Sequence, residues 1–280
     1  MIVGSYGLMM ALGYLTALLV IYRRSRPTTI SSDDMLDLLF WILISSIAGS
    51  RAFYVIMNLD AFADKSWTAL KFWDGGFVFY GGVIAALGAG ALVVRMKKVS
   101  FAMAADMVAP GLSIGHALGR IGCFGVGCCW GKVSTGFPSA RFPIESVVFN
   151  EFQESGFLAA DAATTPPLHP VQLYEALGEC LIFLGLVFLE RKKPFHGAVI
   201  LCYLVFYGVL RFLTEAFRGD PARGFITEWK TPFFNRLMGL SPQESSFLST
   251  SQFISMVLVF FAAAAFCFIY RHQKNRTISG

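Results

Sequence analysis

Arg120 and His116 are the first residues of this sequence whose types and spacing could do chemistry. They are four residues apart, so on a helix the two side chains share one face. A guanidinium group can bind two phosphate oxygens at once. An arginine at the end of a membrane-length apolar run costs about 3 kcal/mol on insertion scales, so its position needs an explanation. One explanation is a phosphate clamp, and the other is a helix-end arginine that reaches the lipid headgroups.

Tyr207, Arg211 and Glu215 form a second group. Their spacing of four residues also places them on one helix face. The arginine and the glutamate could be a structural ion pair inside a helix bundle. A second arginine on the same membrane face as Arg120 favours a different interpretation. We therefore predict a site with two arginines that binds the anionic headgroup of a lipid.

Three cysteines, Cys123, Cys128 and Cys129, stand among glycines directly after the first arginine. With His116 or His169 they could bind a metal. They could also form a redox-active or disulfide pair, or simply pack locally. Their spacing is not a usual zinc spacing, and no second Cys-x-x-Cys pair exists. We therefore favour local packing and expect no metal.

The elements that must position these residues are predicted to be membrane helices. Hydrophobic residues make up 55% of the 280 residues and charged residues 15%, whereas soluble domains carry about 25% charged residues. Several apolar runs are long enough to cross about 30 Å of hydrocarbon as helices. These seven runs cover residues 1–22, 35–58, 75–94, 100–119, 171–189, 197–218 and 249–270. We predict an all-α polytopic membrane protein with seven transmembrane helices in a single membrane domain.

Basic residues cluster directly after the first, third, fifth and seventh runs. They account for much of the net charge of +5, which is therefore no sign of nucleic-acid binding. The positive-inside rule places these clusters in the cytoplasm, so the N-terminus lies outside and the C-terminus inside. The polar segments 120–170 and 219–248 are then extracytoplasmic, and residues 132–168 form a small head segment.

Several motifs carry a resemblance that runs nearly end to end along the chain. They are SYGLMMALGY (5–14), DDMLDL with GSRAFYV (33–55), GGFVFYGG (75–82), GRIGCFGVGCCWG (119–131), HPVQLYE (169–175), RFLTEAFR (211–218) and LSTSQ (248–252). In this order the motifs resemble those of the prolipoprotein diacylglyceryl transferases, a family of the bacterial inner (cytoplasmic) membrane.

The resemblance implies a specific reaction. The diacylglyceryl group of phosphatidylglycerol would move to the thiol of the lipobox cysteine in a prolipoprotein signal peptide, which is the first step of lipoprotein maturation. The expected partners are phosphatidylglycerol, that signal peptide and membrane lipid, with no nucleic acid. The reaction requires neither a metal nor an organic cofactor.

The resemblance also implies roles for individual residues. Arg120 and Arg211 would contact the lipid headgroup and act in catalysis, with Glu215 in the same site. The expected substrate-binding residues are Arg120, Arg211, Tyr6, Tyr207, Gly81 and Gly131.

The sequence departs from the family pattern at several positions. Tyr80 stands where the family has a histidine that is often proposed as catalytic, and Cys123, Val126 and Cys128 replace two asparagines and a glutamate of the signature. Because an unperturbed tyrosine has a pKa near 10, we expect His116 to accept the proton instead, while the Tyr80 hydroxyl orients lipid. The alternative is that His116 only packs and that the substrate thiolate forms without a protein base.

Two further functions remain open from the sequence. One is a divergent paralogue that attaches lipid to another acceptor. The other is a lipid- or anion-binding transporter without chemistry, but the chain lacks the internal repeat that marks many transporters. The sequence therefore favours the enzyme.

Overall fold

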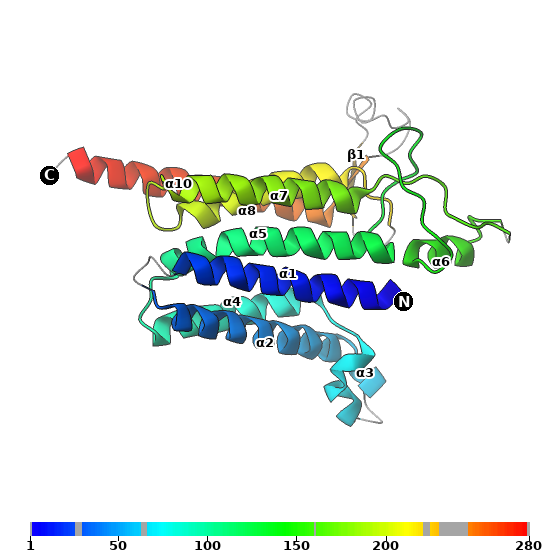
Figure 1. Cartoon of the computed structure of the whole chain (residues 1–280), viewed down its shortest axis with the longest axis horizontal. Helices are drawn as coiled ribbons and strands as arrows, with labels where there is room; N and C mark the ends of the chain where they lie inside the picture. Colours follow the sequence, from blue (N-terminus) through cyan, green and yellow to red (C-terminus); the bar gives the residue numbers. More distant parts are fainter. Residues whose placement is uncertain are drawn as a thin grey trace. The chain divides into compact units, whose positions relative to one another are not determined.

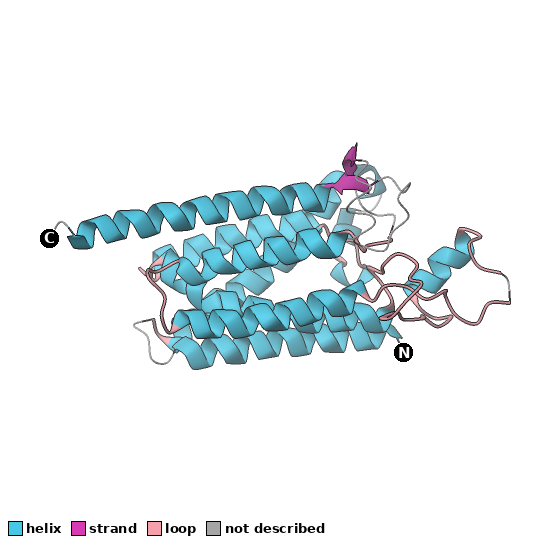
Figure 2. Ribbon diagram, turned by 90° about the horizontal axis from the view of Figure 1, so that it is seen from above, coloured by secondary structure: helices cyan, strands magenta, loops and turns pink. Residues whose placement is uncertain are grey.

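The computed structural model describes residues 2–25, 30–62, 66–159, 161–220, 225–229 and 246–278. Within these ranges, seven helices are long and apolar enough to cross a membrane. They are α1 (Ile2–Ser25), α2 (Ser32–Met57), α4 (Phe79–Met96), α5 (Phe101–Val126), α7 (Val171–Glu190), α8 (Ala198–Glu215) and α10 (Thr250–Ile278). The predicted all-α polytopic fold is confirmed (Figures 1 and 2).

Short elements connect these helices. They are α3 (Leu59–Phe62), the 3-10 helices η1 (Ser66–Leu70) and η2 (Phe72–Asp74), α6 (Val147–Glu154), and the strands β1 (Phe225–Trp229) and β2 (Ser246–Ser249). The two strands pair antiparallel. Figure 2 shows them as the small magenta element at one end of the bundle.

Two of the helix boundaries that differ from the expected ones concern the motif residues. The α4 helix begins at Phe79 rather than at residue 75, because Gly75 and Gly76 adopt φ values of 79° and 75° that a right-handed helix does not allow. The α5 helix continues to Val126, beyond the end of its apolar run at residue 119. Arg120 and Cys123 are therefore helical residues rather than loop residues.

The chain divides into two compact units, residues 18–108 and residues 1–17 with 109–280. In the smaller unit, residues 18–108, α2 packs closely against α4 at two glycines. A Cβ atom on Gly81 would collide with Phe53 and with the carbonyl oxygen of Gly49. The Arg51 guanidinium donates to backbone carbonyls of the connection between the two helices, so its role in this structure is to satisfy backbone groups.

The larger unit, residues 1–17 and 109–280, contains the predicted site. Its α7 helix has a buried polar face with Glu175 and Glu179, whereas its opposite face exposes Leu177, Leu181 and Phe188. A water-soluble helix shows the reverse arrangement. Burial of carboxylates beside exposed leucines is expected when lipid surrounds the helix, so the protein is a multi-pass membrane protein.

The head segment follows α5 and has a small core of its own. Phe142, Val148 and Leu168 are buried there together with Trp130, which directly precedes the segment, and Phe124 at the end of α5 packs against them. Apart from α6, which Figure 1 shows beyond the end of α5, the segment has mostly irregular structure with isolated β-bridges. This core anchors the residues that follow Cys129.

Candidate functional site

Helices α5, α7 and α8 bring the two predicted arginines onto one carboxylate. The Glu175 side chain forms an ion pair with Arg120 through Oε2, and its Oε1 lies 2.9 Å from Nη1 of Arg211. Arg211 also pairs with Glu215, at 2.6 Å between Nη2 and Oε2. Because α5 and α8 end here and α7 begins here, all these groups lie at one end of the bundle.

His116 extends this network away from Arg120. Its Nδ1 lies 2.7 Å from Oε1 of Glu179, and its Nε2 lies 3.1 Å from Nε of Arg120. An arginine can only donate, so Nε2 accepts and Nδ1–H donates to the carboxylate. The Ser113 hydroxyl donates to the other Glu179 oxygen at 2.6 Å. The ring is thus held in one tautomer, with its accepting nitrogen occupied by Arg120.

Further contacts hold Arg211 and Glu175 in place. The Thr214 hydroxyl donates to Oε1 of Glu175 at 3.1 Å, and Arg211 donates to the Ser251 hydroxyl at 3.2 Å. The second contact joins the start of α10 to the site. Groups held by several partners lose little freedom when a ligand binds, which favours pre-organisation.

The charges of this network are not balanced. Two guanidinium groups, of Arg120 and Arg211, share the network with three buried acidic side chains, those of Glu175, Glu179 and Glu215. A phosphate would add another negative charge. A bound phosphate would therefore compete with Glu175 and Glu215 for the two guanidinium groups.

Two predicted tyrosines lie near these groups. The Tyr207 ring contacts His116 edge to face, with 5.4 Å between centroids, and stacks on Tyr203. Tyr6 lies against α5, because a Cβ on Gly122 would be 3.4 Å from its ring. The structure therefore gathers both tyrosines around the arginine network, and their contact with substrate stays a prediction.

Gly131 acts through its backbone in this structure. A Cβ atom there would collide with the carbonyl oxygen of His169. The Lys132 amide donates to the Phe217 carbonyl, and the Gly219 amide donates to the Trp130 carbonyl, so the signature stretch is tied to the end of α8. The close approach of the two chain segments requires glycine here. A role of Gly131 in substrate binding stays a prediction.

Tyr80 and Gly81 belong to the smaller unit. Tyr80 is 54% exposed and contacts the ring of Phe79. Gly81 is buried against α2. Their relation to the arginine network stays a prediction.

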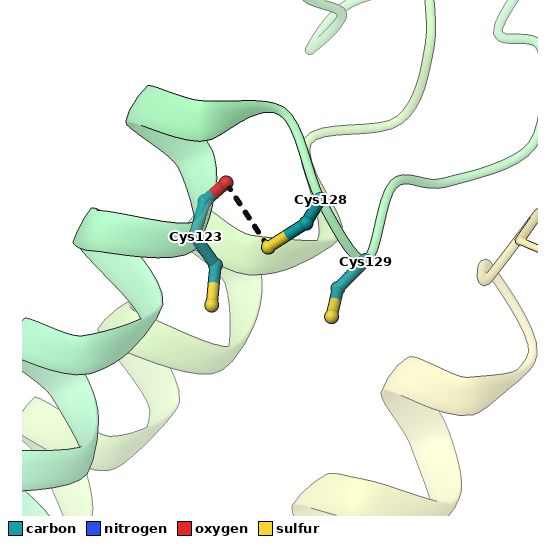
Figure 3. A group of neighbouring side chains, drawn as sticks. All are labelled: Cys123, Cys128 and Cys129. Carbon is teal, nitrogen blue, oxygen red and sulfur yellow. Dashed lines mark hydrogen bonds between the residues drawn. The ribbon is translucent and has the colours of Figure 1, made fainter. Parts of the chain in front are cut away.

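The three cysteines lie together where α5 ends (Figure 3). The amide of Gly127 donates to the Phe124 carbonyl and that of Cys128 to the Cys123 carbonyl. This pair of bonds around a left-handed glycine, with φ of 74°, is the Schellman motif of helix ends. It folds the chain back, so Cys128 and Cys129 return to Cys123. The helix cap therefore explains the unusual spacing of the three cysteines in the sequence.

The surroundings shift the pKa values of two of these thiols in opposite directions. Hydrogen bonds with Cys123 and Cys128, and then Arg218 and Arg120, hold the pKa of the Cys129 thiol below its usual value. Hydrogen bonds with its neighbours and burial raise the pKa of Cys128. Of these two thiols, Cys129 therefore ionises more readily than Cys128.

Neither histidine proposed with these cysteines joins them. Among the described residues, the metal-binding atoms that lie close together here are the three sulfurs alone. The His169 Nδ1 instead lies 3.1 Å from the Tyr174 hydroxyl. Burial, and then Lys132, lowers the pKa of His169, which indicates a neutral packing residue.

Comparison with known proteins decides the family. The model of the prolipoprotein diacylglyceryl transferase family matches residues 1–269. The chain belongs to the prolipoprotein diacylglyceryl transferase family. The resemblance predicted from the motifs is therefore confirmed, and the protein is a transferase of this family.

Relatives in the family cover most of this chain. A phosphatidylglycerol–prolipoprotein diacylglyceryl transferase of Clostridium tetani is 31% identical over 254 residues, which are 91% of this chain and 88% of the relative. One from Geobacter sulfurreducens is 33% identical over 78% of each chain. One from Treponema denticola is 31% identical over 88% of this chain and 80% of the relative.

Sequence reasoning missed the residues that connect the site. Glu175 bridges both arginines, and Glu179 with Ser113 orients His116. One signal was available: Glu175 and Glu179 fall one turn apart on a run that is otherwise apolar. Two carboxylates on one face of a membrane helix need cationic or donor partners, which Arg120, Arg211 and His116 provide.

Proposed function

We propose that this protein transfers the diacylglyceryl group of phosphatidylglycerol to the lipobox cysteine of prolipoproteins. One observation supports it most: in a chain of this family, two arginines from different helices meet on Glu175 at one end of the bundle. The relatives' names specify both the lipid and the protein substrate. The protein would then act in the first step of lipoprotein maturation.

The chemistry of the reaction explains the need for two arginines. The acceptor thiolate attacks the glycerol carbon that carries the phosphate, an S–C bond forms and the C–O bond breaks. Glycerol phosphate leaves as a monoester, so the phosphate gains negative charge as the bond breaks. Arg120 and Arg211 would stabilise that developing charge more than the charge of the bound lipid.

His116 would accept the thiol proton once Arg120 engages the phosphate. In the structure its Nε2 accepts from Arg120. When that N–H turns to the phosphate, the nitrogen becomes free, while Glu179 keeps the ring oriented through Nδ1. Lipid binding and base formation are thereby coupled.

A pair of variants tests this assignment. We expect His116→Ala to lose most activity near pH 7 and to recover as the pH rises, because a free thiol ionises near pH 8.5 without a base. Tyr80→Phe should keep most activity at every pH. Rates across the pH range measure both, with the melting temperature as a check of folding. An inactive Tyr80→Phe beside an active His116→Ala would reverse the assignment.

The site would face the outside of the bacterial inner membrane. Basic residues end α1 and α4 at Arg24 and Arg95, and the positive-inside rule assigns those ends to the cytoplasm. The described start of α1 and the end of α10 lie at opposite ends of the larger unit (Figure 1). Alkaline phosphatase fused after residue 280 should be inactive; an active fusion would contradict this orientation.

The transferase assay uses purified protein, phosphatidylglycerol in micelles and a lipobox peptide. We expect a thioether-linked peptide and glycerol phosphate in equal amounts. The matched peptide with serine for the lipobox cysteine should yield neither. Glycerol phosphate release that does not depend on the peptide thiol would disprove the transferase, and transfer to other thiols alone would indicate a different acceptor.

A further inference from the structure

The three-cysteine cluster has a geometry that suits a metal ion. The sulfur atoms of Cys123, Cys128 and Cys129 all lie within 4.8 Å of one another. Three sulfurs on one Zn²⁺, at a Zn–S distance of about 2.3 Å, lie about 3.8 Å apart in tetrahedral geometry. The sulfurs therefore need to close by at most about 1 Å. Figure 3 shows Cys123 coming from the helix and the other two from the turn that follows it.

The backbone holds this geometry at a cost. Cys129 has a φ of 57°, one of two non-glycine residues with positive φ in the described part of the chain. That conformation is unfavourable for a residue with a Cβ. The Gln172 side chain donates to the Cys128 carbonyl at 2.7 Å, which fixes the turn against α7. Strain that the surrounding structure maintains is a reason to look for a function.

The number of ligands indicates what kind of metal site this is. Among the described residues the cluster contains three thiols and no fourth donor of the His, Cys, Asp or Glu type. Structural zinc sites have four protein ligands, whereas catalytic sites have three and leave one position open. Each thiol is only partly buried, so a ligand can reach it.

We propose that Cys123, Cys128 and Cys129 bind Zn²⁺ and that the open fourth position binds the acceptor thiol. The second half rests on the transferase function proposed above. This proposal departs from the expectation of no metal, which follows from the sequence spacing alone.

Bound zinc would compensate for the absence of the family's histidine, whose position Tyr80 occupies. A thiol that binds Zn²⁺ gives up its proton, which His116 can accept, and the resulting thiolate attacks the lipid carbon without any change of zinc oxidation state. Cys123 lies one helical turn after Arg120, which places the thiolate next to the proposed phosphate site. Arg120 and Arg218 are both within electrostatic range of Cys129, and they offset the negative charge of a zinc ion with thiolate ligands.

Metal content tests the site without any activity measurement. Tag-free protein, purified with a reductant and equilibrated with Zn²⁺, should retain one zinc per chain by mass spectrometry of the elements. Serine replacements at positions 123, 128 and 129 should each weaken binding by at least about 100-fold, because even the loss of an outer contact costs 10- to 100-fold. Cys267→Ser, an exposed cysteine on α10, is the matched control and should bind as the wild type does.

Cobalt substitution tests the open position in the unaltered protein. Co²⁺ in the site should show sulfur-to-cobalt charge-transfer absorption. A lipobox peptide should raise that absorption by about one third, because a fourth thiolate joins three, and the serine peptide should leave it unchanged. Wild-type protein that binds no more zinc than Cys128→Ser, or a disulfide among the three cysteines with no metal bound, would overturn the site.

The two proposals fail in different ways. If thiol transfer proceeds at the full rate after zinc is removed with a chelator, the zinc site is wrong for the reaction and the transferase stands. If zinc binds and the cobalt spectrum responds to the peptide thiol, but no thioether forms, the site stands and the proposed acceptor reaction is wrong.

Discussion

Replacing Arg120 or Arg211 with lysine is expected to lower the transfer rate by about 100-fold, which is the usual loss when one donor to a developing charge is removed. Lysine keeps the positive charge but lacks the planar fork that binds two oxygens at once. Arg211 uses that fork in the structure, since it contacts Glu175 and Glu215 through different nitrogens. The rate of thioether formation, at saturating lipid and peptide, measures the effect.

The matched control is Arg191→Lys, at an exposed position just after α7. It should keep the wild-type rate. The melting temperatures of all three variants in the same detergent show whether they stay folded. Wild-type turnover in folded Arg120→Lys and Arg211→Lys would mean that these arginines only pair with the carboxylates and do not act on the phosphate.

Replacing Glu175 with alanine is expected to lower the free energy of unfolding by about 3 kcal/mol or more. The side chain is 3% exposed and pairs with both arginines. Its loss leaves two buried guanidinium groups with one carboxylate, that of Glu215, in direct contact. Unfolding by denaturant in mixed micelles measures the change.

Glu175→Gln separates charge from shape at this position. Its amide oxygen can still accept from Thr214 and Arg211, whereas the neutral side chain loses the ion pair with Arg120. We expect a smaller loss of stability than for alanine. Glu154→Gln, exposed at the end of α6, should change stability by less than about 0.5 kcal/mol. If Glu175→Ala is as stable as Glu154→Gln, the bridge between the arginines does not hold the bundle together.

These two predictions differ in origin. The importance of Arg120 and Arg211 follows from the sequence, because a charged residue in or beside a membrane helix is costly and therefore informative. The importance of Glu175 follows from the structure, because nothing in a single sequence says which carboxylate on α7 meets which arginine on α5 and α8.

The sequence by itself determined the fold class, the seven spans and the family. Hydropathy is sufficient for this because lipid excludes unpaired backbone groups, so long apolar runs must be helical. The periodicity of a helix also placed Tyr207, Arg211 and Glu215 on one face, and the structure shows the ion pair between the last two. These are relations within one helix, which the spacing of residues defines.

The tertiary structure decided the relations between helices. It joined Arg120, Glu175 and Arg211 from three helices, and it occupied the accepting nitrogen of His116. It also turned an unusual cysteine spacing into a compact cluster, because the helix cap at Gly127 reverses the chain. Distances across a bundle depend on how the helices pack, and a single sequence does not contain them as a period or a spacing.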